Sequence, residues 1–264
     1  MNDLVRQTDG EPIARLRGIG KTYPNGVVAL SGFDLDVRDG EFVSLLGPSG
    51  CGKSTALRIL AGLSEPTHGS IRLRDGVGAG DSVGFVFQEP TLMPWTSVFA
   101  NVALPLRLAG VGRTEAAPRV MQALARVGMA DFAAAYPREL SGGMKMRVSI
   151  ARALVTAPRL LLMDEPFAAL DEITRFKLND DLLALWRALR MTIVFVTHSV
   201  FESVFLSERV VVMTGRPGRV SSELAIDAPQ RDERFRTSAD YAGFCRLASE
   251  ALARAMRESD RATA

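Results

Sequence analysis

The sequence predicts an α/β fold whose central sheet is mainly parallel. Five short apolar runs rich in Val, Ile and Leu are separated by segments with the apolar spacing of helices. Such runs are typical of strands buried on both faces, as in a parallel sheet covered by helices. A change of character between residues 89 and 138 indicates a helical insertion in this core. The runs expected to form strands are 41–46, 82–87, 160–163, 192–196 and 210–213.

The expected insertion and a C-terminal tail define the domain organisation. Pro90, Pro94 and Pro105 interrupt the start of the insertion, and residues 115–127 then show helical spacing. Residues 239–256 predict a further helix, whose apolar side runs from Tyr241 to Met256. We expect one domain over residues 1–225, with a helical subdomain at about 89–145, and a helical tail over 226–264. The glycine-rich run at 76–80 matches no dinucleotide-binding pattern and predicts a surface loop.

Composition limits the function classes. The net charge is +2, and Lys and Arg are spread along the chain, so there is no electrostatic case for nucleic acid as a partner. Cys51 and Cys245 lie far apart in the sequence, which favours a reducing compartment. The polar first residues do not resemble a secretory signal peptide. Because no stretch approaches the roughly 20 apolar residues of a membrane-spanning helix, any work at a membrane requires another chain to span it.

A phosphate-binding loop is the strongest motif. The segment from Gly47 to Ser54 fits the pattern G-x-x-x-x-G-K-[ST], between an expected strand and an expected helix. The glycines let backbone N–H groups face phosphates, Lys53 can reach the β and γ phosphates, and Ser54 can bind Mg²⁺. A glycine-rich turn is the alternative. The motif predicts a P-loop NTPase core that binds ATP and Mg²⁺, with nucleotide contacts from Gly47, Pro48, Ser49, Gly50, Cys51, Gly52, Lys53, Ser54 and Thr55.

Two adjacent acids follow the expected strand at 160–163. Ligands of open α/β sheets collect at the carboxyl ends of strands, where Asp164 and Glu165 lie. Successive strand residues point to opposite faces, so the two carboxylates should do different work unless the strand bends there. We expect Asp164 to hold Mg²⁺ and Glu165 to polarise an attacking water. The alternative is a pair of exposed acids without a role.

The segment Leu140-Ser141-Gly142-Gly143, followed by Met144, resembles the signature Leu-Ser-Gly-Gly-Gln of ABC transporter ATP-binding subunits. The resemblance covers nearly the whole chain in the family's order. It implies an antiparallel β segment near the N-terminus and assigns adenine stacking to Tyr23. It also implies that Gln88 lies in the Q-loop and that Asp171 lies in the D-loop at a dimer seam. A simpler role for Asp171 is to cap the following helix.

The resemblance implies the remaining roles. Catalysis is assigned to Lys53, Gln88, Glu165 and His198, and Mg²⁺ binding to Ser54, Gln88 and Asp164. Ser141, Gly142 and Gly143 would contact the nucleotide held by a second subunit. His198 could otherwise be a structural histidine, and Tyr23 an ordinary strand or turn aromatic.

Methionine in place of the signature glutamine is familiar from importers of the nitrate, sulfonate and taurine group. The implied partners are a second ATP-binding subunit, a transmembrane permease and, through it, an extracytoplasmic solute-binding protein. The implied location is the cytoplasmic face of the membrane, as a peripheral protein. Leu92 and Trp95, after the Q-loop, would as exposed residues suit docking of a permease helix; the alternative is that they are buried. A soluble ABC ATPase of DNA repair or translation and an exporter subunit are the alternatives.

Overall fold

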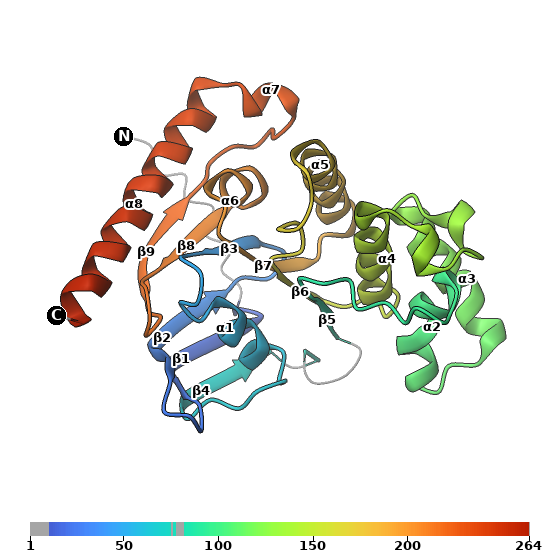
Figure 1. The fold of residues 1–264 in the computed structure, drawn as a ribbon, viewed down its shortest axis with the longest axis horizontal. Helices are drawn as coiled ribbons and strands as arrows, with labels where there is room; N and C mark the ends of the chain where they lie inside the picture. Colours follow the sequence, from blue (N-terminus) through green and yellow to red (C-terminus); the bar gives the residue numbers. More distant parts are fainter. Residues whose placement is uncertain (1–10, 75, 78–81, 264) are drawn as a thin grey trace.

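The computed structural model describes residues 11–74, 76–77 and 82–263, and these residues form two sheets with helices around them (Figure 1). The predicted α/β class with a mainly parallel sheet is confirmed. A six-stranded sheet has the order β5-β6-β7-β3-β8-β9, in which only β9 is antiparallel to its neighbour. Its strands are β3 (Phe42–Leu46), β5 (Val83–Val86), β6 (Leu160–Asp164), β7 (Thr192–Thr197), β8 (Arg209–Met213) and β9 (Val220–Ala225).

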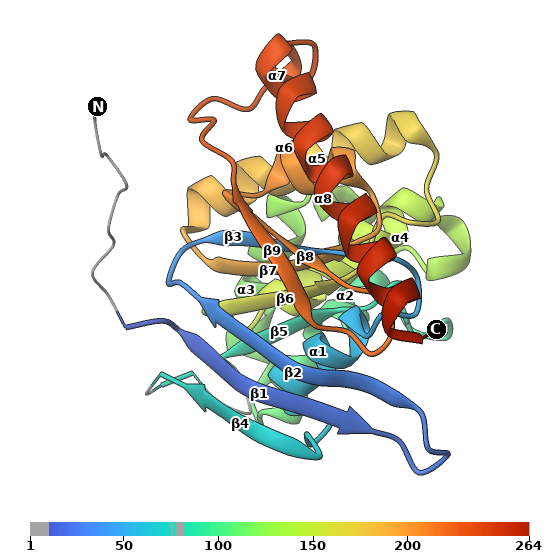
Figure 2. The same ribbon diagram turned by 90° about the vertical axis from the view of Figure 1, so that its left-hand side faces the viewer.

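The smaller sheet is antiparallel, has the order β2-β1-β4, and contains the N-terminal part of the described chain (Figure 2). Helix α1 lies between the two sheets. Phe33 of the small sheet, Leu57 of α1 and Val194 of the main sheet belong to one buried core. This packing holds the first turn of α1 at the carboxyl end of β3. The elements are β1 (Ala14–Thr22), β2 (Val28–Val37), β4 (His68–Leu73) and α1 (Lys53–Leu60).

Helices α2, α3 and α4 form a group beyond strand β5, at the right of Figure 1. Arg152 of α4 donates hydrogen bonds to the backbone oxygens of Pro90 and Thr91, which ties the segment after Gln88 to this helix. The run at 76–80 reaches residues outside the described part of the chain. The helices are α2 (Val98–Leu108), α3 (Arg113–Arg126) and α4 (Gly142–Leu154), with short 3-10 turns at Ala130–Phe132 and Pro137–Glu139.

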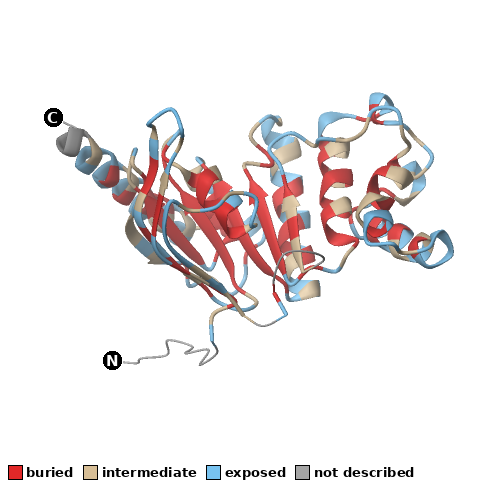
Figure 3. Cartoon of the chain, turned by 90° about the horizontal axis from the view of Figure 1, so that it is seen from below, coloured by how far each residue is buried: buried red, intermediate tan, exposed pale blue. Residues whose placement is uncertain are grey.

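The other face of the main sheet is covered by α5 (Glu172–Leu189), α6 (Val200–Leu206), α7 (Glu233–Arg236) and α8 (Ala239–Thr263). Small buried side chains on α8, among them Ala248 and Ala255, let this helix lie close to Val210 and Val212 of β8. The helix extends past its predicted end at 256, and Met256 is exposed rather than buried. Figure 3 shows buried residues running through the centre of both sheets.

Within the described residues, none of the helices combines the length and the apolar character needed to cross a bilayer.

Candidate nucleotide-binding site

The loop between β3 and α1 has a backbone that requires glycine. Gly52, immediately before α1, has a φ of 104°, and a Cβ on it would lie 2.7 Å from the oxygen of Ala29. Gly50 also has a positive φ, of 76°. A side chain at Gly52 would therefore strain the backbone and collide with the small sheet. The resulting curve brings the N-terminus of α1, with its positive end, to a shared pocket.

Lys53 is held over this loop rather than extended into solvent. Its side chain is only 3% exposed, and Nζ donates hydrogen bonds to the oxygens of Gly47 at 2.9 Å and Pro48 at 3.0 Å. The same ammonium lies 3.4 Å from Oε1 of Glu165. A desolvated ammonium in this position is suited to a polyphosphate, because it can bind the negative charge without a change in its own conformation.

Ser54 and Asp164 meet although 110 residues separate them in the sequence. Ser54 Oγ donates a hydrogen bond to Asp164 Oδ1 at 2.7 Å. Burial raises the pKa of Asp164, and the hydrogen bond from Ser54 opposes that rise. One hydroxyl and one carboxylate are the hard oxygen ligands that suit Mg²⁺, which usually completes its coordination with phosphate oxygens and water. The donor set therefore fits the metal.

The chain bends at Glu165, and both neighbouring acids contact the phosphate loop. Glu165 has a φ of 45°, and its backbone N–H donates to the oxygen of Val196 on the adjacent strand. Its Oε2 lies 2.8 Å from Nδ1 of His198, while Oε1 faces Lys53. Because of this bend, the usual alternation of strand side chains does not direct the two carboxylates to opposite faces of the sheet.

Two hydrogen bonds of Thr197 stabilise the loop that carries His198. The Thr197 hydroxyl donates to Oε2 of Glu202 at 2.5 Å and accepts from the backbone N–H of Ser199 at 2.9 Å. Burial raises the pKa of Glu202. These bonds fix the backbone on both sides of His198, whose own side chain is half-exposed and free to meet a ligand beside Glu165.

Tyr23 reaches the same place from the end of the small sheet. Its hydroxyl lies 3.1 Å from Thr55 Oγ1, and its ring faces the ammonium of Lys21 at 5.5 Å. The pocket between these elements has a volume of about 370 Å³, within the range of small-molecule sites. It is lined by Tyr23, Val27, Ala29, Ser49, Gly50, Gly52, Lys53, Ser54, Thr55, Gln88, Glu165 and Arg216.

Sequence reasoning missed Arg216 as a pocket residue. It follows β8 in a turn-rich segment, and its Nε donates to the oxygen of Gly50 at 3.1 Å. The signal available in the sequence was the run Gly215 to Gly218, which indicates a tight turn but not where that turn lies.

The Leu-Ser-Gly-Gly segment lies outside this pocket, at the start of α4. Ser141 caps the helix by accepting a hydrogen bond from the N–H of Met144, as expected for a residue at this position. A Cβ on Gly143 would lie 2.7 Å from a methyl group of Thr174 on α5. Asp171 caps α5 through the N–H of Thr174. Ser141, Gly143 and Asp171 thus form a second cluster, which does not contribute to the lining of the pocket of the same chain.

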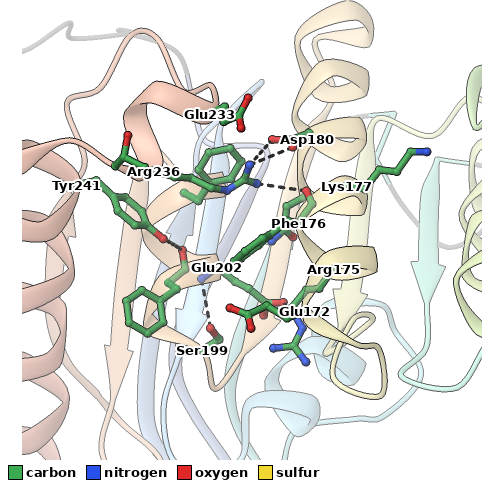
Figure 4. A pocket seen from close by; sticks show the side chains of 14 residues that line it. Glu172, Arg175, Phe176, Lys177, Asp180, Ser199, Glu202, Glu233, Arg236 and Tyr241 are labelled. Carbon is green, nitrogen blue, oxygen red and sulfur yellow. Dashed lines mark hydrogen bonds and ion pairs between the residues drawn. The ribbon is translucent and has the colours of Figure 1, made fainter.

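A more voluminous cleft, of about 820 Å³, lies between α5, α6 and the tail (Figure 4). Arg236 crosses it from α7, binds Asp180 of α5 at 2.9 Å, and packs its guanidinium 3.6 Å from the ring centre of Phe205. Tyr241 of α8 donates to the oxygen of Phe201 on α6. Because this cleft has no phosphate-binding loop, we place the nucleotide in the smaller pocket.

A hydrophobic groove adjoins strand β5 and the segment after it. It has a volume of about 340 Å³ and includes Phe87, Leu104 and Leu108 in its lining. Trp95, which follows in the chain, is 75% exposed, as its expected docking role requires. Exposed apolar side chains of this size are typical of a surface that meets another protein.

Residues 30–168 match the family model described as ABC transporter. A nitrate import ATP-binding protein of Synechocystis sp. is 46% identical over 210 residues, covering 78% of this chain and 79% of that protein. An aliphatic sulfonates import ATP-binding protein of Mesorhizobium japonicum is 44% identical over 234 residues, covering 89% and 86%.

A solved structure is also similar to this chain. The dimeric ATP-binding cassette MJ0796, in a post-hydrolysis state bound to ADP and Pi, aligns with a TM-score of 0.71 and 34% identity. The alignment covers 81% of this chain and 99% of that one.

Proposed function

Because this chain belongs to the ABC transporter family, as an ATP-binding subunit that hydrolyses ATP, we propose that it powers the import of a small solute of the nitrate, sulfonate and taurine type. The observation that carries the proposal is the similarity to nitrate and sulfonate import subunits over more than three quarters of the chain. The domain division at residue 225 is part of this proposal: the cassette precedes it and the tail follows it.

In the proposed mechanism, the loop from Gly47 to Thr55 binds the triphosphate and Tyr23 stacks on adenine. Lys53 neutralises the β and γ phosphates. Mg²⁺, held by Ser54, Asp164 and Gln88, would supply charge neutralisation at the phosphate oxygens. The buried position of Lys53 supports this assignment, because a preorganised cation loses little on binding an anion.

The hydrolytic step uses the acid at the bend. Glu165 accepts a proton from water as the water oxygen attacks the γ phosphorus, and the bond to the β–γ bridging oxygen breaks to release ADP and phosphate. His198 orients the γ phosphate and the carboxylate of Glu165. The 2.8 Å contact between these two side chains supports their joint role.

The second cluster completes the site of another copy. Ser141, Gly142 and Gly143 begin a helix whose N-terminal N–H groups suit an anion. We assign them to the γ phosphate held by the partner's loop, with Asp171 at the seam. These residues do not line the pocket of their own chain, which supports a head-to-tail pair with two shared sites.

Closure of that pair would move a transmembrane permease that receives solute from an extracytoplasmic binding protein. The chain would then lie on the cytoplasmic face of the membrane, with Trp95 and the groove beside strand β5 in contact with a permease helix. The tie from Arg152 to the segment after Gln88 supports this route, because it links the groove to the pocket. Although methionine replaces the signature glutamine at position 144, Ser141 still caps α4, because the bond uses the backbone N–H of Met144.

Co-expression with candidate permeases, starting with any membrane protein encoded next to this chain, tests the proposal. We expect recovery of both chains from detergent-solubilised membranes, and ATPase activity that rises with the imported solute in reconstituted vesicles. Trp95→Ala should reduce recovery of the membrane protein, whereas Leu63→Ala, at another exposed apolar position, should not. Recovery with ribosomes or DNA would favour the class of DNA repair or translation ATPases. Transport out of the reconstituted compartment would favour an exporter.

A further inference from the structure

The turn between β8 and β9 is pressed against the phosphate loop. The backbone N–H of Gly218 donates to the oxygen of Ala29, and the N–H of Ser31 donates to the oxygen of Gly218. A Cβ on Gly218 would lie 2.0 Å from the oxygen of Cys51, so only glycine allows this approach. The turn therefore has a fixed position relative to the nucleotide pocket, although it comes from the C-terminal part of the chain.

Arg216 is the residue that this turn presents to the pocket. Its Nε donates to the oxygen of Gly50 at 3.1 Å, and its side chain lines the same pocket as Lys53 and Ser54. The hydrogen bond from Nε fixes one edge of the guanidinium group. The amino groups of an arginine anchored in this way can still donate to phosphate oxygens, for which the planar fork is well matched.

The charges that line the pocket make this arginine important for anion binding. Lys53 lies 3.4 Å from the carboxylate of Glu165, so much of its charge is offset within the protein. Arg216 adds a second cation to the lining of the pocket. We infer that Arg216 is a phosphate-binding residue of the nucleotide site, an inference that rests on the proposed location of ATP.

The tail helix positions this arginine. The N–H of Gly215 donates to Oγ of Ser259 on α8 at 2.6 Å, and the same hydroxyl donates to the oxygen of Ala255. Helix α8 thus holds the residue next to Arg216, near the helix's C-terminal end. Ser259 is a positioning residue: it acts on the nucleotide only through the turn and Arg216.

Calorimetric titration of the full chain with ATP in EDTA tests both roles without relying on turnover. Arg216→Ala should weaken ATP binding about tenfold, the lower end expected for a hydrogen bond to a charged group at an exposed site. Arg216→Lys should lose less, because it keeps the charge but not the fork. Arg219→Ala, which removes a cation from the same turn outside the pocket lining, is the matched control and should bind as the wild type does.

A double-mutant cycle tests the positioning role. Ser259→Ala should weaken binding by a smaller factor than Arg216→Ala, and should add nothing when Arg216 is already Ala. Wild-type binding of ATP together with unchanged binding by Arg216→Ala would overturn the inference while leaving the proposed function intact. Equal losses of ATP affinity in Arg216→Ala and Arg219→Ala would mean that the loss comes from the net charge of the turn, and not from a contact between Arg216 and phosphate. Additive losses for Arg216 and Ser259 would remove the link through the turn. Failure of the wild type to bind ATP would refute the proposed site itself.

Discussion

Glu165 Oε2 lies 2.8 Å from Nδ1 of His198, a contact between the end of β6 and the loop that follows β7. It is possible only because the backbone turns at Glu165 and because Thr197 and Glu202 fix the loop of the histidine. The two side chains therefore hold each other in place beside Lys53. A group that must orient water gains from such support, since its rotamer is set before the substrate binds.

Replacement of Glu165 by Gln tests this arrangement. We expect ATP hydrolysis to fall by a factor of about 100 or more, because general-base catalysis typically contributes that much. The amide keeps the shape of the side chain, so ATP binding should change little. Phosphate release and calorimetric binding of ATP measure the two effects. Glu250→Gln, on the exposed side of α8, is the matched control. Near-normal turnover of the Glu165→Gln protein would remove the water-polarising role.

Two substitutions at Tyr23 separate the ring from the hydroxyl. Tyr23→Ala should weaken ATP binding about tenfold or more, since stacking of a base on an aromatic ring contributes about 1–3 kcal/mol. Tyr23→Phe removes only the contact with Thr55 and should keep most of the affinity. Titration with ATP measures both. Equal losses in the two variants would mean that the hydroxyl, rather than stacking, is what the site requires.

A buried ion pair joins the two sheets away from the pocket. Arg209 of β8 binds Glu41, and it also donates to the backbone oxygen of Asp36 on β2. Both side chains are buried, so Arg209→Met should leave the carboxylate of Glu41 with only the exposed Arg38 at 4.0 Å as a partner, and lower the free energy of unfolding by about 3 kcal/mol. Chemical denaturation measures the loss. The double variant Glu41→Leu with Arg209→Met should recover much of it; a double variant as unstable as the single one would contradict this explanation.

Both cysteines should react slowly in the folded protein. Burial raises the pKa of the Cys51 thiol and of the Cys245 thiol. Because the thiolate is the reactive form, a raised pKa leaves less of it at pH 8, and the rate should climb only as the pH rises further. A colorimetric thiol reagent should detect both thiols promptly in guanidinium chloride but not in native buffer. Cys245→Ser assigns the remaining signal to Cys51, and prompt native labelling of that variant would contradict the prediction.

The strands of the parallel sheet and the phosphate loop could be predicted because their signals are local. Apolar runs mark β3, β6 and β7, and the glycines before Lys53 mark a loop that approaches phosphate closely. The sequence also placed Asp164 and Glu165 at a strand end. Their roles stay predictions, but the contacts of Asp164 with Ser54 and of Glu165 with Lys53 are structural facts.

What could not be predicted depends on tertiary contacts. The turn of the backbone at Glu165 is fixed by a hydrogen bond to Val196, which is distant in sequence. Strand β9 has no fully buried residue and lacks an apolar run, so the sequence pattern did not indicate its pairing with β8. Arg216 reaches the pocket because Gly218 fits against Cys51, and a turn-rich segment alone does not tell where it docks.

The left-handed backbone at Glu165 has a consequence for how this protein can change. An ordinary side chain in that region costs about 1–2 kcal/mol relative to the right-handed one, whereas glycine is indifferent. Under the proposed mechanism, turnover requires glutamate at position 165, whereas thermal resistance favours a residue that accepts this backbone. A screen of variants for heat resistance alone should therefore return glycine or asparagine at position 165, in proteins that still bind ATP but no longer cleave it.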